Sequence, residues 1–251
     1  MIGIGVDVGG SGIKVGAADL VTGTLVSERL QEKTPNPSTP DRVVEIIATL
    51  VGRVAPLAGA AAPVGIGVPC VVLDGVTKTA ANIDQAWIDF DADRVVEGVL
   101  RRPVRVVNDA DAAGLAEMRF GAGRGKRGVV LMLTLGTGVG SALFTDGHLV
   151  PNTELGHLEI RGADAEDRSA AAVKTRESLS WEAWAALLDE HIRAIDRILW
   201  PDLIILGGGV SRDADRFIPL LTARPPIVAA TLENDAGIVG AALAAAERLG
   251  P

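Results

Sequence analysis

The sequence repeats itself at a distance of about half its own length. Three short segments of the first half recur in the same order in the second half: residues 7–12 at 134–138, 22–26 at 146–150, and 108–110 at 234–236. One match of this kind would carry little weight, but three in one order predict a duplicated unit. Apolar strand patterns alternate with helical patterns in each half, so the expected unit is β-β-β-α-β-α-β-α.

Duplication of such a unit defines the expected fold class. It is an α/β fold with two lobes around a central cleft and a glycine turn from each lobe on its walls. The last helix, expected at 236–249, is predicted to pack back on the first half. The predicted domains are therefore a small lobe of residues 1–107 and 236–251 and a large lobe of residues 108–235.

Composition disfavours several classes of protein. The 251 residues are 48% hydrophobic and 22% charged, as is typical of a globular protein. The net charge of -8 disfavours nucleic acid and anionic membranes as partners. Cys70 is the one cysteine, which excludes an intramolecular disulfide and a thiolate metal cluster. The sequence contains no apolar run long enough to span a membrane, and we expect a cytoplasmic protein.

Glycine turns follow the first strand of each half. Their members are Gly9, Gly10, Ser11 and Gly12 in the first half and Gly136, Thr137 and Gly138 in the second. Glycines allow backbone N–H groups to approach a phosphate closely, and the hydroxyl groups add donors. Each turn alone is compatible with an ordinary hairpin, whereas two such turns can grip a phosphate chain from both sides.

Polar residues flank these turns. Asp7 ends the first strand, where it is placed to hold Mg²⁺ through water, and Lys14 adds a point charge after the turn. Thr134 takes the place of Asp7 in the second half. A later strand is followed by Gly207, Gly208 and Gly209. These three glycines either let a nucleotide or a phosphate chain lie on the backbone or form a tight strand-to-helix turn.

Asn108 and Asp109 stand between a short buried strand, expected at 103–107, and a helix, expected at 112–120. A residue at this point is fixed at the carboxyl edge of the sheet, where open α/β sheets bind ligands. Both residues are also favoured helix N-caps. The pattern on its own therefore fits either a general base or a cap.

The segment from Glu154 to Glu159 combines two carboxylates with His157. Such groups bind sugar hydroxyls well, because each hydroxyl is both donor and acceptor. The same segment is compatible with a metal site, with Glu154 and His157 as ligands, or with a solvated loop. A basic run precedes the strand of the second glycine turn, at Arg124, Lys126 and Arg127. This run is either a surface loop or a track for a polyanion.

Together these motifs resemble the ROK family of sugar kinases, within the actin-like ATPase superfamily, and more closely its actinobacterial polyphosphate glucokinases. The segments that carry the resemblance are Asp7–Lys14, 108–110, Leu135–Gly140, 154–157, 163–168, 207–211 and 236–240. The resemblance covers essentially the whole chain. It implies a duplicated actin-like, ribonuclease H-like fold.

The resemblance also implies a role for each motif. Asp109 would be the general base on the glucose 6-hydroxyl. The sugar-binding residues that it implies are Asn82, Asn108, Asp109, Glu154, His157 and Glu166. In many ROK kinases another glutamate follows a cysteine-rich zinc motif and touches the sugar. That motif is absent here, so no structural zinc is expected, and Glu166 is assigned in place of that glutamate with Glu159 as the alternative.

The activity that the resemblance implies is phosphoryl transfer from inorganic polyphosphate to the 6-hydroxyl of glucose, with ATP as a second donor. An ATP-dependent glucokinase or mannokinase of the same family is one alternative, and a non-catalytic sugar sensor is another. The expected cofactor is Mg²⁺ and the expected assembly is a homodimer.

Overall fold

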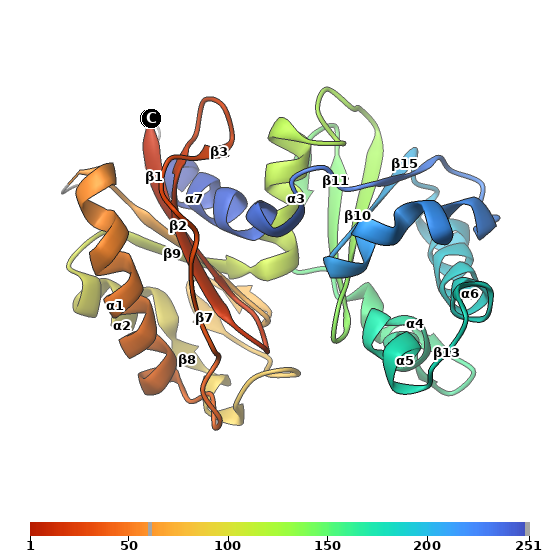
Figure 1. Ribbon diagram of the computed structural model, residues 1–251, viewed down its shortest axis with the longest axis horizontal. Helices are drawn as coiled ribbons and strands as arrows, with labels where there is room; N and C mark the ends of the chain where they lie inside the picture. The colour runs from red at the N-terminus through yellow and green to blue at the C-terminus, as the bar shows by residue number, and fades with distance from the viewer. Residues whose placement is uncertain (60–61, 249–251) are drawn as a thin grey trace. The chain divides into compact units, whose positions relative to one another are not determined.

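The computed structural model describes residues 1–59 and 62–248, which form two compact units (Figure 1). The first unit comprises Met1–Ala116 with Asp235–Pro251, and the second comprises Glu117–Asn234. The domain boundaries expected from the sequence, at 107/108 and 235/236, differ from this division. The reason is that helix α3 (Asp109–Phe120) begins inside the first unit, where its residue Ala112 packs against Gly240.

The first unit is built on a six-stranded sheet in the order β3-β2-β1-β5-β9, with β4 paired to β2. Its strands are β1 (Ile2–Val8), β2 (Ile13–Asp19), β3 (Thr24–Leu25), β4 (Leu30–Glu32), β5 (Val64–Val68) and β9 (Val104–Asn108). Strand β1 is antiparallel to β2 and parallel to β5, which is parallel to β9. A smaller sheet is formed by β6 (Val72–Leu73), β7 (Val76–Thr77) and β8 (Phe90–Asp91), and η1 (Gln85–Trp87) lies before β8.

Helices cover both faces of this sheet. Figure 1 shows α1 (Pro40–Ala58) and α2 (Ala92–Leu100) on one side and α7 (Ala236–Arg248) on the other. Ile4 and Val6 of β1 are fully buried in one cluster with residues of α1. Alternate residues of a strand face opposite sides of the sheet, so Gly5 between them faces α7. On the α7 side, a β-carbon at Gly5 or Gly65 would collide with backbone atoms of α7. Glycines at these positions therefore let α7 lie directly on the sheet. The expected end of this last helix at Leu249 lies outside the described residues.

The second unit repeats the order and direction of five of these strands, β3-β2-β1-β5-β9. Its sheet has the order β12-β11-β10-β15-β16. The strands are β10 (Val129–Leu135), β11 (Val139–Thr145), β12 (His148–Val150), β15 (Leu203–Gly207) and β16 (Ile227–Ala229). Strand β10 is antiparallel to β11 and parallel to β15, which is parallel to β16. This match of order and direction confirms the duplication that the sequence repeats predict. The helix expected between the last two strands of the second half is wrong, because two short 3-10 helices connect β15 to β16.

The long helix of the second unit is α6 (Trp181–Leu199), whose N-cap Ser180 accepts a hydrogen bond from the Ala183 amide. Its apolar face buries Trp184, Leu188 and Ile192 against the leucines of β10. Shorter elements connect the strands: η2 (Leu155–His157), β13 (Glu159–Ile160), β14 (Ala163–Asp164), α4 (Glu166–Ser169), α5 (Ala171–Arg176), η3 (Gly209–Arg216), η4 (Ile218–Leu220) and η5 (Glu233–Asp235). Over residues 1–59 and 62–248, no helix is long and apolar enough to cross a membrane.

Candidate active site

The first glycine turn joins β1 to β2 and is closed by a 2.9 Å hydrogen bond from the Gly9 amide to the Gly12 carbonyl. The register of the two strands sets Asp7 opposite Lys14. The Lys14 ammonium lies 2.8 Å from Asp7 Oδ2, and the Asp7 side chain is 17% exposed. The structure thus joins the predicted metal-holding residue and the predicted point charge in one ion pair beside the turn.

The second glycine turn joins β10 to β11 and is closed by a shorter-range bond, 3.0 Å from the Gly136 amide to the Gly138 carbonyl. The Gly136 carbonyl in turn accepts a 3.0 Å hydrogen bond from the Ala172 amide at the start of α5. Thr134 pairs with Gly207 at the end of β15. The turn and the glycine run therefore meet at one edge of the second sheet, the carboxyl end of parallel strands, where open α/β sheets bind ligands.

Within the glycine run, position 208 requires a glycine for steric reasons. Its φ is +86°, and a β-carbon at this position would collide with the backbone of Leu135. A residue with a side chain is therefore strained and crowded here. Gly209 has open space around its α-carbon and begins η3, so the backbone beside the second turn is uncovered.

Asn108 ends β9 and caps α3. Its Oδ1 accepts hydrogen bonds from the amides of Ala110, at 2.9 Å, and Asp111, at 3.1 Å. Its Nδ2 donates to the Cys70 carbonyl at 3.2 Å. The cap interpretation therefore applies to Asn108. Asp109 is the first residue of the helix and is half-buried, with Gly67 of the neighbouring strand directly beneath its α-carbon.

Asn82 lies in an irregular segment between β7 and η1 and is exposed. Its carbonyl oxygen would lie 3.6 Å from a β-carbon at Gly10. The structure thus sets this predicted sugar-binding residue beside the first glycine turn.

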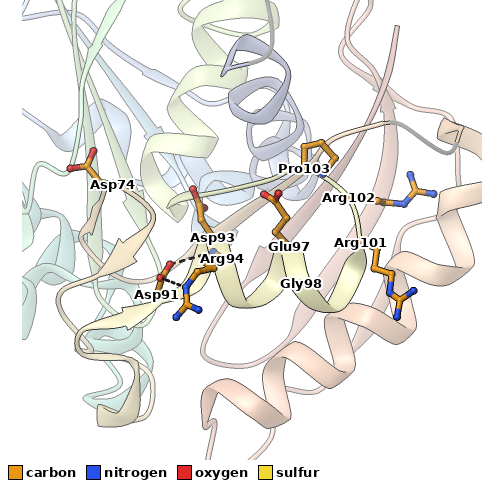
Figure 2. Close-up of a pocket in the computed structure, with 9 residues that line it drawn as sticks. All are labelled: Asp74, Asp91, Asp93, Arg94, Glu97, Gly98, Arg101, Arg102 and Pro103. Atoms are coloured by element: carbon orange, nitrogen blue, oxygen red, sulfur yellow. Dashed lines mark hydrogen bonds and ion pairs between the residues drawn. The ribbon is translucent and has the colours of Figure 1, made fainter.

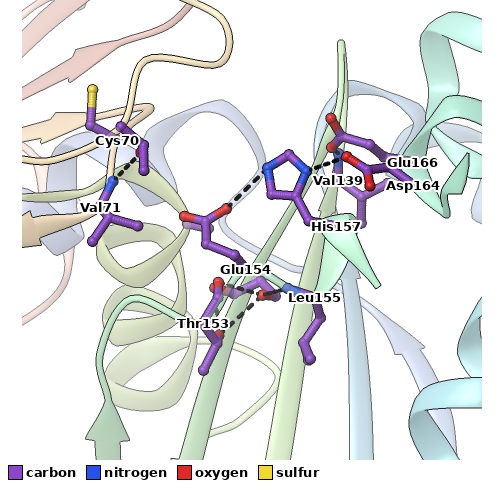
Figure 3. A network of polar contacts seen from close by, with 12 residues as sticks. Cys70, Val71, Val139, Thr153, Glu154, Leu155, His157, Asp164 and Glu166 are labelled. Carbon is purple, nitrogen blue, oxygen red and sulfur yellow. Dashed lines mark hydrogen bonds and ion pairs between the residues drawn. The ribbon is translucent and has the colours of Figure 1, made fainter. Parts of the chain in front are cut away.

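His157 lies between two carboxylates (Figure 3). Its Nδ1 is 2.7 Å from Asp164 Oδ2, and its Nε2 is 3.8 Å from Glu154 Oε2. The pKa of His157 is raised, mainly because of its hydrogen bond with Asp164. Burial raises the pKa of Glu154, and the nearby Glu166 carboxylate adds to this effect. The sequence did not single out Asp164, because its partner lies seven residues away across a turn.

Glu166 connects the histidine segment to the second glycine turn. Its Oε2 accepts a 2.8 Å hydrogen bond from the Val139 amide, just after the turn. A β-carbon at Gly138 would lie 2.5 Å from the same oxygen, and one at Gly156 would lie 2.9 Å from it. Glu159, the alternative considered from the sequence, is exposed on β13. Glu166 therefore lies between the second glycine turn and the segment that carries His157.

A buried histidine, His191, forms a hydrogen bond to the same segment. His191 is 1% exposed, and its Nε2 lies 2.9 Å from the Leu155 carbonyl. Its Nδ1 lies 2.8 Å from the Ser169 hydroxyl. Burial lowers the pKa of His191. Because a carbonyl oxygen can only accept, His191 Nε2 is the donor in the bond to Leu155. This contact was not predicted from the sequence, in which His191 is simply a histidine on the apolar face of α6.

Residues 1–59 and 62–248 contain no cluster of three or more His, Cys, Asp or Glu side chains that could hold a metal ion. Mg²⁺ does not need such a cluster, because it keeps several waters and is bound by one or two carboxylates together with substrate phosphates. Asp7, beside the first glycine turn, fits this type of site.

Another cavity of the first unit lies away from Asn108. It has a volume of about 760 Å³ and lies along α2, lined by Asp74, Asp91, Asp93, Arg94, Glu97, Gly98, Arg101, Arg102 and Pro103 (Figure 2). Pro103 precedes β9, so the cavity lies at the opposite end of that strand from Asn108. Arg94 pairs with Asp91 at 2.6 Å, and Asp93 accepts a hydrogen bond from the Val106 amide. Asp91, Asp93 and Arg94 therefore stabilise the local structure around α2.

A family model and a curated relative both match most of this chain. The model of the ROK family matches residues 3–171. Over 243 residues the chain is 49% identical to the polyphosphate glucokinase of Mycobacterium tuberculosis (strain CDC 1551 / Oshkosh), covering 96% of this chain and 90% of that protein.

Two solved structures resemble this one over nearly their whole length. The inorganic polyphosphate/ATP-glucomannokinase from Arthrobacter sp. strain KM is 48% identical, with a TM-score of 0.95, covering 98% of this chain and 99% of that one. A ROK family glucokinase from Streptomyces griseus, in complex with glucose and AMPPNP, is 26% identical, with a TM-score of 0.85 and complete coverage of both chains. These matches confirm the predicted fold class, the duplicated actin-like ATPase fold.

Proposed function

The chain belongs to the ROK family, and on that premise we propose that it is a polyphosphate-dependent glucokinase that also accepts ATP. The observation that carries this proposal is the identity of 49% to a polyphosphate glucokinase over 96% of the chain. The likeness to a polyphosphate/ATP-glucomannokinase supports ATP as a second donor.

In the proposed reaction, Asp109 is the general base. The glucose O6 forms a bond to the terminal phosphorus of the donor while the bond from that phosphorus to its bridging oxygen breaks. The hydroxyl proton goes to the Asp109 carboxylate, and the electron pair of the broken bond stays on the shortened polyphosphate. The Asn108 cap supports this role, because it fixes the start of the helix that carries Asp109. Catalysis of this kind depends mainly on positioning and on charge stabilisation.

The remaining residues bind the two substrates in this proposal. Backbone N–H groups of the two glycine turns donate to the phosphates, which carry most of the negative charge of the transition state. Asn82, Asn108, Glu154, His157 and Glu166 hold the sugar hydroxyls. The proposal for Glu154, His157 and Glu166 is supported by their proximity within the second unit. Glu154 lies 3.8 Å from His157, and the Glu166 carboxylate contributes to the raised pKa of His157.

The kinase relatives imply a divalent metal in general. We propose that this metal is Mg²⁺ and that Asp7 holds it through water, with Lys14 compensating the carboxylate when no metal is bound. When bound, such an ion neutralises charge on the donor phosphates. The homodimer and the cytoplasmic location expected from the sequence belong to the same proposal and are supported by the family resemblance alone.

The experiment that tests the function is a coupled glucose-6-phosphate assay with glucose, Mg²⁺ and either polyphosphate or ATP as donor. Turnover with polyphosphate is the expected result. Turnover with ATP alone would keep the kinase assignment and remove the polyphosphate assignment. Glucose binding without turnover on either donor would instead identify a non-catalytic sugar sensor.

A further inference from the structure

A cavity of about 490 Å³ opens directly from the second glycine turn. Its walls include Gly136, Thr137, Lys174, Trp181 and Gly209, all within the second unit. Helix α5, which carries Lys174, is attached to the turn through the hydrogen bond from the Ala172 amide to the Gly136 carbonyl. The cavity therefore provides space for the part of the donor that continues beyond the phosphate held at the turn.

The ring of Trp181 forms an aromatic platform in the wall of this cavity. Trp181 stacks on Phe217 with an angle of 10° between the rings and 5.9 Å between their centres. Phe217 is fully buried and packs edge-on against Trp184, which is fully buried as well. A platform fixed in this way does not need to be ordered when a ligand arrives.

The platform is covered by a cation. The Lys174 ammonium lies 4.1 Å from the centre of the Trp181 ring, within the range of a cation–π interaction. Arg216 also lies over this ring, at 4.8 Å, but it is partly neutralised by Asp213 at 3.9 Å. Within residues 1–59 and 62–248, no carboxylate forms an ion pair with Lys174. Lys174 therefore brings a positive charge without an ion-pair partner to the cavity wall, to which Asp213 also contributes a carboxylate.

We propose that Lys174 is a donor-binding residue that holds the trailing phosphates of a polyphosphate chain whose terminal phosphate lies at the second glycine turn. The inference rests on the proposed function and adds to it a basis for donor selectivity. A nucleoside that stacks on Trp181 must first displace the ammonium from the ring. A phosphate chain needs only the ammonium itself, which can bind it while remaining over the aromatic face.

The test compares three variants in the coupled assay with tripolyphosphate, long-chain polyphosphate and ATP. Lys174→Met removes the charge and keeps an unbranched side chain over Trp181, whereas Lys174→Arg keeps the charge. Arg176→Met is the matched control, since it removes one positive charge from an exposed position of the same helix where Arg176 pairs with Glu177. We expect Lys174→Met to raise the KM for both polyphosphates about tenfold or more, the effect of losing a charge-assisted contact. The KM for ATP should not rise, Lys174→Arg should restore most of the polyphosphate affinity, and Arg176→Met should behave as the wild type.

Two results would overturn the inference alone. If the wild type uses polyphosphate and Lys174→Met behaves like Arg176→Met, Lys174 does not bind the donor. If Lys174→Met weakens polyphosphate and ATP equally, the residue does not discriminate between donors. A wild type that turns over with ATP and not with polyphosphate would instead overturn the polyphosphate assignment itself, and the inference with it.

Discussion

Nδ1 of His157 lies 2.7 Å from Oδ2 of Asp164, while Nε2 of the same ring faces Glu154 at 3.8 Å. Asp164 thereby fixes which nitrogen carries the proton in the neutral ring, since a carboxylate accepts and Nδ1–H must donate. The other nitrogen is directed to the Glu154 side. This orientation is set within the second unit, before any substrate is bound.

Replacement of Asp164 by Asn should lower the pKa of His157, because the carboxylate that stabilises the imidazolium is lost. It should also raise the KM for glucose, since the ring loses its fixed orientation. An NMR titration of the His157 ring measures the pKa directly. Asp167→Asn is the control, because Asp167 lies on α4 nearby and is exposed. An unchanged His157 pKa in the Asp164 variant would refute the contact.

The two histidines should affect stability with opposite dependence on pH. The pKa of His157 is raised in the folded state, so its contribution is present at low pH and is lost as pH rises through that folded pKa. The pKa of His191 is lowered by burial. Below the unfolded-state value of about 6.5, the unfolded chain therefore takes up a proton at His191 that the folded chain does not, and stability falls.

Urea unfolding between acidic and neutral pH tests the contribution of His191. His191→Gln should flatten the loss of stability on acidification, because the buried titrating group is gone. It should also raise the KM for glucose, since the Leu155 carbonyl loses its donor. His148→Gln is the control at an exposed histidine at the start of β12. Equal pH profiles for the wild type and His191→Gln would contradict the assignment.

Asp109→Asn should keep the fold and the affinity for glucose while kcat falls by about a hundred- to ten-thousandfold, as for loss of a general base. The duplicated unit supplies a matched control in Asp235→Asn. Asp235 holds the corresponding place before α7 and forms an exposed ion pair with Arg29 at 2.8 Å. Its variant should retain wild-type kcat. A near-normal rate for Asp109→Asn in the coupled assay would end this mechanism.

Asn108→Ala should lose both stability and activity. The variant removes two cap hydrogen bonds and the bond to the Cys70 carbonyl, which should lower the free energy of unfolding by about 1–3 kcal/mol. The kcat should fall as well, because Asp109 follows the cap directly. Asp91→Ala removes the exposed cap of α2 and should leave kcat unchanged. A loss of stability in Asn108→Ala without any loss of kcat would show that the cap does not position Asp109.

Features encoded by local pattern could be predicted from the sequence. The three recurring segments predict the duplicated topology, which the strand orders β3-β2-β1-β5-β9 and β12-β11-β10-β15-β16 confirm. Both glycine turns lie where the sequence places them, between the first two strands of each unit. The sequence could not decide whether Asn108 or Asp109 caps the helix, because both side chains are good caps. The answer depends on the exact residue at which the helix begins, and a sequence pattern does not fix that residue.

Contacts between separate segments could not be predicted. Asp164 reaches His157, and Glu166 reaches the Val139 amide, only once the turn at η2 and helix α4 have packed. The domain boundary within α3 depends on the close approach of Ala112 and Gly240, which are 128 residues apart in sequence. The position of Lys174 over Trp181 likewise depends on the packing of α5 on α6.

The basic run Arg124, Lys126 and Arg127 should matter only for long polyphosphate. These side chains are exposed and precede the amino end of β10, whereas the second glycine turn follows its carboxyl end. The length of a seven-residue strand separates them by about 20 Å. A triple Gln variant should therefore leave the KM for tripolyphosphate and ATP unchanged, whereas only a chain long enough to span that distance would lose affinity. Steady-state kinetics across donor lengths measures this, with Lys174→Met as the comparison that weakens both polyphosphates. Weakened tripolyphosphate in the triple variant would show that the run contacts the donor close to the turn and would contradict the separation along β10.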